Sequence, residues 1–144
     1  RIIRELIEFK PKSNLTNIGE VVQHFNNLVK KRAIAFLISD FIGQNLEKAL
    51  KITAKKHDLI ALRIYDQREK ELPNVGLTLF EDGESGKRRW INTRKKRVRE
   101  TYYNNSLSRE HNILEIFKKS KVDHANICIQ SGYIQPLMNL FKKR

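Results

Sequence analysis

The sequence predicts an α/β fold, namely a partial doubly wound sheet with parallel central strands and flanking helices. Strand-like apolar segments near 33–39, 59–65 and 125–129 alternate with segments of helical periodicity. One short amphipathic helix separates the first two strands, and a strand–helix–strand unit of this kind pairs its strands in parallel. Two β-like runs around a glycine-containing turn add a β-hairpin near 77–92. With no internal repeat or low-complexity linker, we expect a single domain over residues 1–144.

The segment 33–40 is the one around which the rest is arranged. Its six consecutive apolar residues cannot alternate between a wet and a dry face, so we expect a central strand covered on both sides. It ends at Asp40, and open α/β sheets bind ligands just beyond the carboxyl ends of their strands. Asp40 can therefore hold a metal ion or face a partner, or it can simply turn the chain or cap the next helix. Asp66 closes the second strand and is expected at the same edge of the sheet.

The helix after the first loop has a recognisable start. Asn17 followed by Glu20 forms a capping box, which predicts a helix beginning at about Ile18. Thr16 lies in the loop immediately before it. Its hydroxyl can cap the helix or point into the crevice, and spacing does not choose between these roles.

A second, longer helical pattern is predicted over about 94–119. Its weak point is 104–106, where Asn and Ser side chains compete for backbone hydrogen bonds. A closing helix carries Pro136 in its first turn, where proline is tolerated.

The net charge of +13 favours a polyanionic partner such as nucleic acid, an acidic protein face or an anionic membrane surface. The cations lie in four runs, at 30–32, 87–89, 94–99 and 142–144. Cations are also favoured at helix C-termini by the helix dipole, so their dispersal fits a purely structural role almost as well.

Trp90 lies between two of these runs. It could stack on a base, although a tryptophan in a hairpin more often covers apolar surface. The candidate anion-binding residues around it are Lys87, Arg88, Arg89, Arg94, Lys95, Lys96, Arg97 and Arg99.

Several classes of protein are disfavoured. No apolar run approaches the ~20 residues that a membrane-spanning helix needs. The single cysteine, Cys128, excludes an internal disulfide, and its apolar surroundings indicate a small buried side chain rather than a nucleophile. The four histidines show no metal-ligand spacing.

Four segments in this order resemble the bacterial von Willebrand factor A-like proteins catalogued as domain of unknown function 58. They are Ser-Asn-Leu-Thr-Asn at 13–17, Lys-Arg-Ala-Ile-Ala-Phe-Leu-Ile-Ser-Asp-Phe at 31–41, His-Asp-Leu-Ile-Ala-Leu-Arg at 57–63 and Asp-Gln-Arg-Glu-Lys-Glu-Leu-Pro at 66–73. The resemblance implies a doubly wound sheet with a metal-ion-dependent adhesion site. Thr16 matches the threonine of that site and Asp40 its aspartate.

The resemblance also implies that part of the site lies elsewhere. Its Asp-x-Ser-x-Ser motif is absent from this sequence, and the family places that motif upstream of Arg1. We therefore expect the C-terminal half of the fold. Mg²⁺ or another divalent ion is expected in the full-length protein, with none held by this chain alone, because one hydroxyl and one carboxylate leave most of the coordination to water.

The function implied is a non-enzymatic protein-interaction module, whose partner is a protein such as a MoxR-type AAA+ ATPase. We expect a cytoplasmic location, or the cytoplasmic face of the inner membrane if upstream helices exist. A strand at 33–38 without a neighbour would expose an apolar edge, which predicts self-association.

Two other functions stay open at this point. One is a Mg²⁺-dependent nuclease or phosphoesterase that uses Asp40, Asp66 and Glu69 as metal ligands. The other is a basic nucleic-acid-binding module built on the cations around Trp90.

Overall fold

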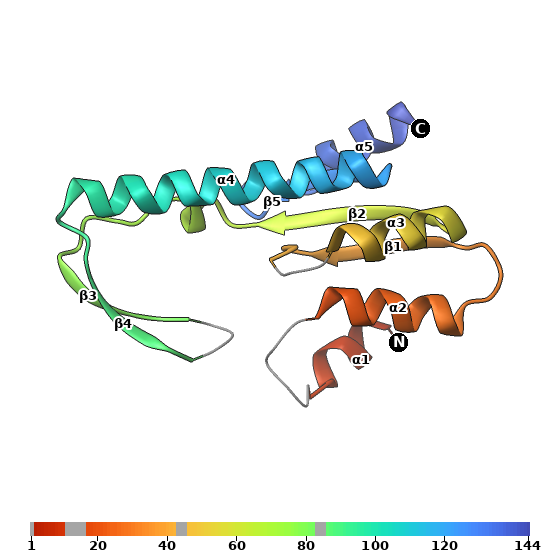
Figure 1. Cartoon of the computed structure of the whole chain (residues 1–144), viewed down its shortest axis with the longest axis horizontal. Coiled ribbons are helices and arrows are strands. Elements are labelled where there is room, and N and C mark those ends of the chain that lie inside the picture. Colours follow the sequence, from red (N-terminus) through yellow and green to blue (C-terminus); the bar gives the residue numbers. More distant parts are fainter. Residues whose placement is uncertain (1, 11–16, 43–45, 83–85) are drawn as a thin grey trace.

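The computed structural model describes residues 2–10, 17–42, 46–82 and 86–144. It contains a parallel three-stranded sheet in the order β1–β2–β5, so the carboxyl ends of these strands meet at one edge (Figure 1). Ile34 lies opposite Asp58, and Ile60 lies opposite Asp123. The α/β class is therefore confirmed. The strands are β1 (Ile34–Ser39), β2 (Asp58–Tyr65) and β5 (Asp123–Cys128).

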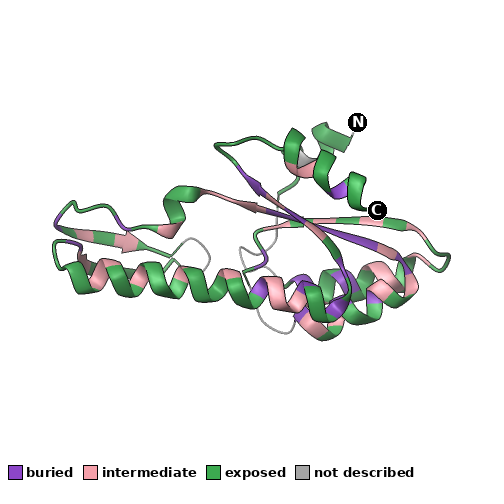
Figure 2. Ribbon diagram, turned by 90° about the horizontal axis from the view of Figure 1, so that it is seen from above, coloured by how far each residue is buried: buried purple, intermediate pink, exposed green. Residues whose placement is uncertain are grey.

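Helices cover both faces of this sheet (Figure 2). On one face a core forms around Leu50, Phe41 and Phe117, between the sheet and three helices. On the other face, Leu140 of the last helix packs against Ile60 and its neighbours. The three helices of the first face are α2 (Ile18–Leu28), α3 (Leu46–Lys56) and α4 (Lys96–Ser120), and that of the second is α5 (Ile134–Lys143). A short helix α1 (Ile2–Glu8) precedes them.

β2, not β1, is the central strand of the described sheet. Residues 59–63 of β2 are all buried, as expected for a strand with a neighbour on each side. In β1 burial alternates: Leu37 packs against the core, whereas Ile34, Phe36 and Ile38 are exposed. The prediction that β1 is central and covered on both sides is wrong for the described chain, because only one described strand pairs with it. The apolar edge expected at 33–38 is present.

A protruding arm extends beyond the sheet (Figure 1). It consists of the N-terminal half of α4 and an antiparallel hairpin of β3 (Leu77–Glu81) and β4 (Arg88–Asn92), which confirms the predicted hairpin. We call residues 75–82 and 86–109 the arm. Thr93 stabilises the base of the arm by two hydrogen bonds. Its hydroxyl donates to the carbonyl of Gly76 at 2.9 Å and accepts from the amide of Val75 at 3.0 Å.

The predicted helix boundaries hold closely. The side chain of Asn17 accepts a hydrogen bond from the amide of Glu20 at 3.2 Å, so α2 begins at Ile18 as expected. α4 continues unbroken through 104–106. β5 begins at Asp123, two residues before the predicted start. None of the described helices combines the length and the apolar character that crossing a bilayer requires.

Candidate functional site

A small cavity of about 50 Å³ opens where β1 and β2 end. It lies at the edge of the sheet where an open α/β fold binds ligands. Its lining mixes acids with cations, and it includes Asp40 and Asp66 as well as Glu69. The expectation that Asp40 and Asp66 lie at the same edge is confirmed.

Asp40 is held in a tight turn. Its Oδ1 accepts hydrogen bonds from the amide of Ile42 at 3.1 Å and from the hydroxyl of Ser39 at 3.3 Å. The side chain is exposed, and its Oδ2 accepts no hydrogen bond within the described ranges. Asp40 therefore does turn the chain, as one interpretation of the sequence had it, while the residue remains exposed.

Phe41 anchors this turn. Its backbone is left-handed, with φ of 58°, a conformation that costs a non-glycine residue about 1–2 kcal/mol. The ring is 1% exposed and packs edge-on against Phe117, with centroids 4.9 Å apart. Burial of this ring offsets the backbone cost and fixes the position of the neighbouring Asp40.

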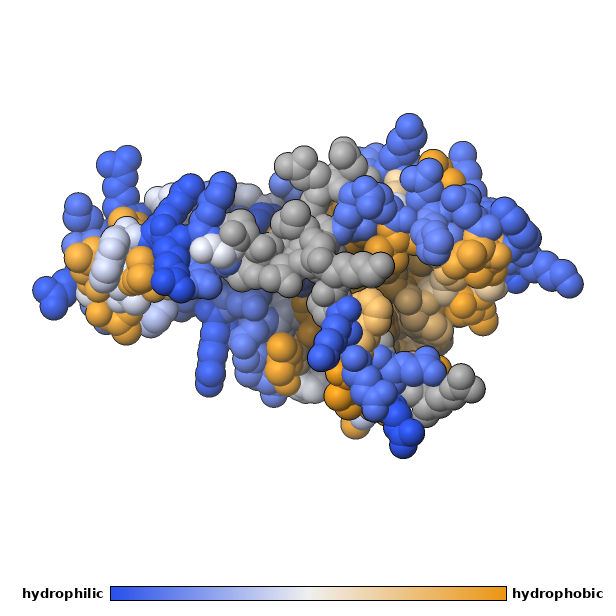
Figure 3. Space-filling view, turned by 90° about the horizontal axis from the view of Figure 1, so that it is seen from below, coloured by the Kyte–Doolittle hydropathy of each residue, from blue (hydrophilic) through white to orange (hydrophobic). Residues whose placement is uncertain are grey.

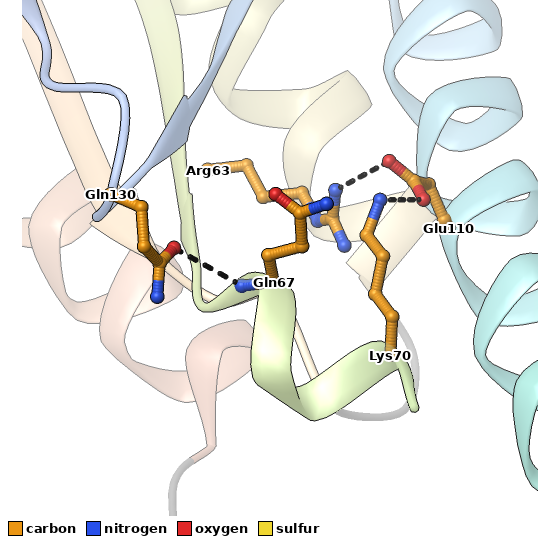
Figure 4. A network of polar contacts seen from close by, with 5 residues as sticks. All are labelled: Arg63, Gln67, Lys70, Glu110 and Gln130. Atoms are coloured by element: carbon orange, nitrogen blue, oxygen red, sulfur yellow. Dashed lines mark hydrogen bonds and ion pairs between the residues drawn. The ribbon is translucent and has the colours of Figure 1, made fainter. Parts of the chain in front are cut away.

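Asp66 has a structural role as a helix cap. It caps the 3₁₀ helix η1 (Gln67–Lys70), accepting from the amide of Arg68 at 2.7 Å and from Nε2 of Gln130 at 2.5 Å. Gln130 in turn accepts from the amide of Gln67 at 3.3 Å, which ties the end of β5 to η1 (Figure 4). The hydrogen bond from the Arg68 amide, then that from Gln130, lowers the pKa of the Asp66 carboxyl. Sequence reasoning missed Gln130, because only the fold brings it to Asp66.

Arg63 is a cation buried in the central strand, with 8% of its surface exposed. Its Nη1 lies 3.2 Å from Oε1 of Glu110, and Nζ of Lys70 lies 2.8 Å from Oε2 of the same carboxylate (Figure 4). Both cations also lie over the ring of Tyr65, at 5.0 Å and 4.7 Å from its centroid. The hydrogen bond from Lys70 is the main cause that lowers the pKa of Glu110.

Sequence reasoning missed this network too, but a clue existed. Arg63 interrupts the otherwise apolar segment 59–65, and a buried arginine needs an acidic partner. Nothing in the sequence identifies that partner as Glu110, 47 positions away.

The cavity at this edge is lined by three acids, Asp40, Asp66 and Glu69. No three acidic, histidine or cysteine side chains within the described ranges are grouped closely enough to hold a metal ion. The set of Asp40, Asp66 and Glu69 therefore receives no support as a catalytic metal site. Thr16 lies outside the described residues. Asp40 is exposed and accepts hydrogen bonds only at Oδ1 within the described ranges, which is compatible with the role of a single ligand.

The candidate anion-binding residues all lie on the arm, where several have internal roles. Arg99 donates to the carbonyls of Thr93 and Arg94, at 2.6 Å and 3.0 Å, and so closes the turn between β4 and α4. Arg88 pairs with Glu81 at 2.6 Å, and Lys96 pairs with Glu100 at 3.5 Å.

Three more of these cations, Arg89, Lys95 and Arg97, are exposed to solvent. Arg94 is exposed too and lies beside Gly76 at the base of the hairpin. Trp90 is 67% exposed, so it does not take the covering role that is commoner for a hairpin tryptophan.

Comparison with known proteins places the chain in a family. Residues 1–112 match the family described as "Protein of unknown function DUF58". The chain belongs to the DUF58 family. This confirms the resemblance found in the sequence. The match includes β1, β2, the hairpin, the cavity residues up to Arg109 and the ion-pair partner Glu110.

Relatives of this DUF58 chain occur in mycobacteria. "Uncharacterized protein Rv1480" of Mycobacterium tuberculosis and "Uncharacterized protein Mb1516" of Mycobacterium bovis are each 40% identical over 58 residues, which is 40% of this chain and 18% of each relative. "Uncharacterized protein MAV169" of Mycobacterium avium is 36% identical over 58 residues, or 34% of its length. The matched part thus spans about a third or less of these relatives. No solved structure matches the chain.

Proposed function

We propose that this DUF58 chain is part of a non-enzymatic protein-interaction module of the von Willebrand A type. In this proposal a divalent cation at the carboxyl edge of the sheet is shared between the module and a carboxylate of its partner. The supporting observation is the turn at Asp40, which leaves this residue exposed at the end of β1 and is anchored by the buried Phe41 ring.

Asp40 and Thr16 would hold the ion from this chain. A hard cation such as Mg²⁺ prefers six oxygen ligands in octahedral geometry, and two protein ligands leave most of these positions to water. We therefore expect weak binding by this chain and tighter binding where further oxygen ligands are supplied. Asp66 would keep its structural place, because its carboxylate caps η1 and ties it to Gln130 after β5.

The partner proposed is a protein, and a MoxR-type AAA+ ATPase is the first to test, on the strength of the family resemblance. An ion held by few protein ligands keeps exchangeable positions, which a partner's carboxylate can occupy. The interaction would then depend on the cation and on Asp40, without any chemical step at the site.

The experiment compares two exposed acids that line the same cavity. Binding of a purified MoxR-type ATPase is measured by surface plasmon resonance in Mg²⁺ and in EDTA. Asp40→Ala should weaken binding at least tenfold and remove its dependence on Mg²⁺. Glu69→Ala should leave the affinity and the Mg²⁺ dependence unchanged, because Glu69 lies in η1 and not at the end of β1. Equal effects of the two substitutions would show that the edge acts through negative charge alone, and the metal proposal would fail.

A further inference from the structure

The four runs of cations divide into two kinds once the helices are located. Residues 30–32 follow the C-terminus of α2, and residues 142–144 end α5, which are positions that the helix dipole favours. Residues 94–99 lie at the N-terminus of α4, where the dipole opposes cations, and the first turn of this helix contains no acid. Residues 87–89 begin β4, where no helix dipole acts. Helix dipoles therefore account for only two of the runs, and the other two share the arm.

The hairpin beside these cations has an uncovered apolar face. Leu79 lies directly opposite Trp90, and Leu77, two residues earlier in β3, lies on the same face. All three side chains are exposed, and a hairpin of two strands alone is at best marginally stable in water. This face gains stability when something apolar covers it.

A cation lies at the base of that apolar face, and an ion pair lies at its outer end. There Arg88, on the same face as Trp90, pairs with Glu81 of β3 at 2.6 Å. At the base, the guanidinium of Arg94 lies beside Gly76, the residue before Leu77. Lys95 follows at the N-cap of α4, and Arg97 lies in the first turn of this helix. Figure 3, viewed from below, shows apolar and strongly hydrophilic side chains interleaved over the arm at the left.

We propose that the β3–β4 hairpin, together with the cations at the start of α4, docks onto the surface of an anionic lipid bilayer. Leucine side chains and an indole ring partition into the boundary between headgroups and acyl chains, while bordering arginines and lysines meet lipid phosphates. Nucleic acid would use the cations and Trp90 but offers nothing apolar for Leu77 and Leu79. This surface includes none of the residues that line the Asp40 cavity, so the two proposals can fail independently.

The chain carries its own probe, because Trp90 is the single tryptophan. The test measures Trp90 fluorescence and co-sedimentation with vesicles of phosphatidylcholine alone or mixed with phosphatidylglycerol. We expect binding and a shift of emission to shorter wavelength only with the anionic vesicles, and reversal of both at high salt. No shift with anionic vesicles, or an equal shift with neutral ones, would overturn the proposal.

Two matched pairs of variants separate charge from apolar contact. Lys95→Ser/Arg97→Ser should weaken binding roughly 30-fold, whereas Lys142→Ser/Lys143→Ser removes the same charge from the end of α5 and should change it little. Serine is a favourable N-cap, so the substitution at Lys95 does not threaten the fold. Equal weakening by both double variants would show a general charge effect and overturn the assignment to the arm.

The second pair keeps the charge constant. Leu77→Ser should weaken vesicle binding, while Leu28→Ser at the end of α2 should not; these leucines are 63% and 68% exposed. If Leu77→Ser binds like the unsubstituted chain, the hairpin does not enter the bilayer and the proposal is wrong. It is equally wrong if single-stranded oligonucleotide quenches Trp90 and displaces the vesicles, since the arm would then be a nucleic-acid surface.

Discussion

Glu110 is the residue on which the carboxyl edge of the sheet depends most. It is the acidic partner of both Arg63 and Lys70, and its side chain is only 20% exposed. Without it, the Arg63 charge stays buried with no ion pair among the described residues, and an uncompensated buried charge is strongly destabilising.

Replacing this carboxylate tests that dependence. We expect Glu110→Gln to lower the free energy of unfolding by about 2–4 kcal/mol, measured by urea denaturation. The matched control is Glu100→Gln on the same helix, where the ion pair with Lys96 is exposed and the expected change is below about 0.5 kcal/mol. Similar losses for the two variants would contradict the special role of Glu110.

The same residue makes stability depend on acid. The pKa of Glu110 in the folded chain lies below its ordinary value of 4.5, chiefly because Lys70 donates a hydrogen bond to the ionised form. A lowered folded pKa means that the stabilisation is present above about pH 4.5 and is lost as the pH falls through the folded pKa. We expect the difference in unfolding free energy between the unsubstituted chain and Glu110→Gln to be constant near neutrality and to shrink below pH 4.5. A difference that does not change with pH would exclude this linkage.

At the scale of the element, α4 ends in a motif that suits glycine better than its present residue. Lys121 follows the helix in a left-handed conformation, with φ of 53°. Its amide donates to the carbonyl of Lys118 at 3.2 Å, and the amide of Val122 donates to that of Phe117 at 3.0 Å, which is the Schellman arrangement.

Glycine adopts this conformation without the cost of a Cβ atom. We expect Lys121→Gly to raise the free energy of unfolding by about 1 kcal/mol, measured by thermal or urea denaturation. Lys118→Gly, inside the last turn of the same helix, should lower it by about 1 kcal/mol. Two changes of the same sign would show that the helix does not end as described.

At the scale of the whole molecule, the edge strand β1 determines how the chain can associate with other copies. β1 has no strand partner on its outer side among the described residues, and its exposed side chains are apolar. It contains no proline and no charged residue to block pairing with another chain. We expect this chain to self-associate through β1.

A charged residue on that strand should prevent the association. Phe36→Lys is expected to shift the chain toward monomer in analytical ultracentrifugation, at little cost in stability, because Phe36 is 50% exposed. Phe141→Lys on α5 is the matched control at 51% exposure, and it should leave the association unchanged. If only the α5 substitution disrupts the assembly, the edge of β1 is not the interface.

Local patterns predicted most of the elements because each depends on neighbours in sequence. The capping box at Asn17, the periodicity of α3 and α4 and the glycine turn of the hairpin all act within a few residues. The placement of Asp40 and Asp66 at one edge also followed from sequence, since parallel strands share a direction. The predicted weak point at 104–106 lies within an unbroken 25-residue helix, because propensity is a weak influence there.

Sequence by itself thus determined the α/β class, the order of the elements, the family and the polar residues at the strand ends. Tertiary structure alone decided that β2 is central, that Arg63 meets Glu110, that Gln130 holds Asp66 and that Trp90 stands exposed among cations. These features join segments far apart in the chain, and whether an apolar strand is buried depends on which elements pack against it. A run of apolar residues indicates how much free energy a strand would gain from burial. Only the packed fold shows whether that strand is buried.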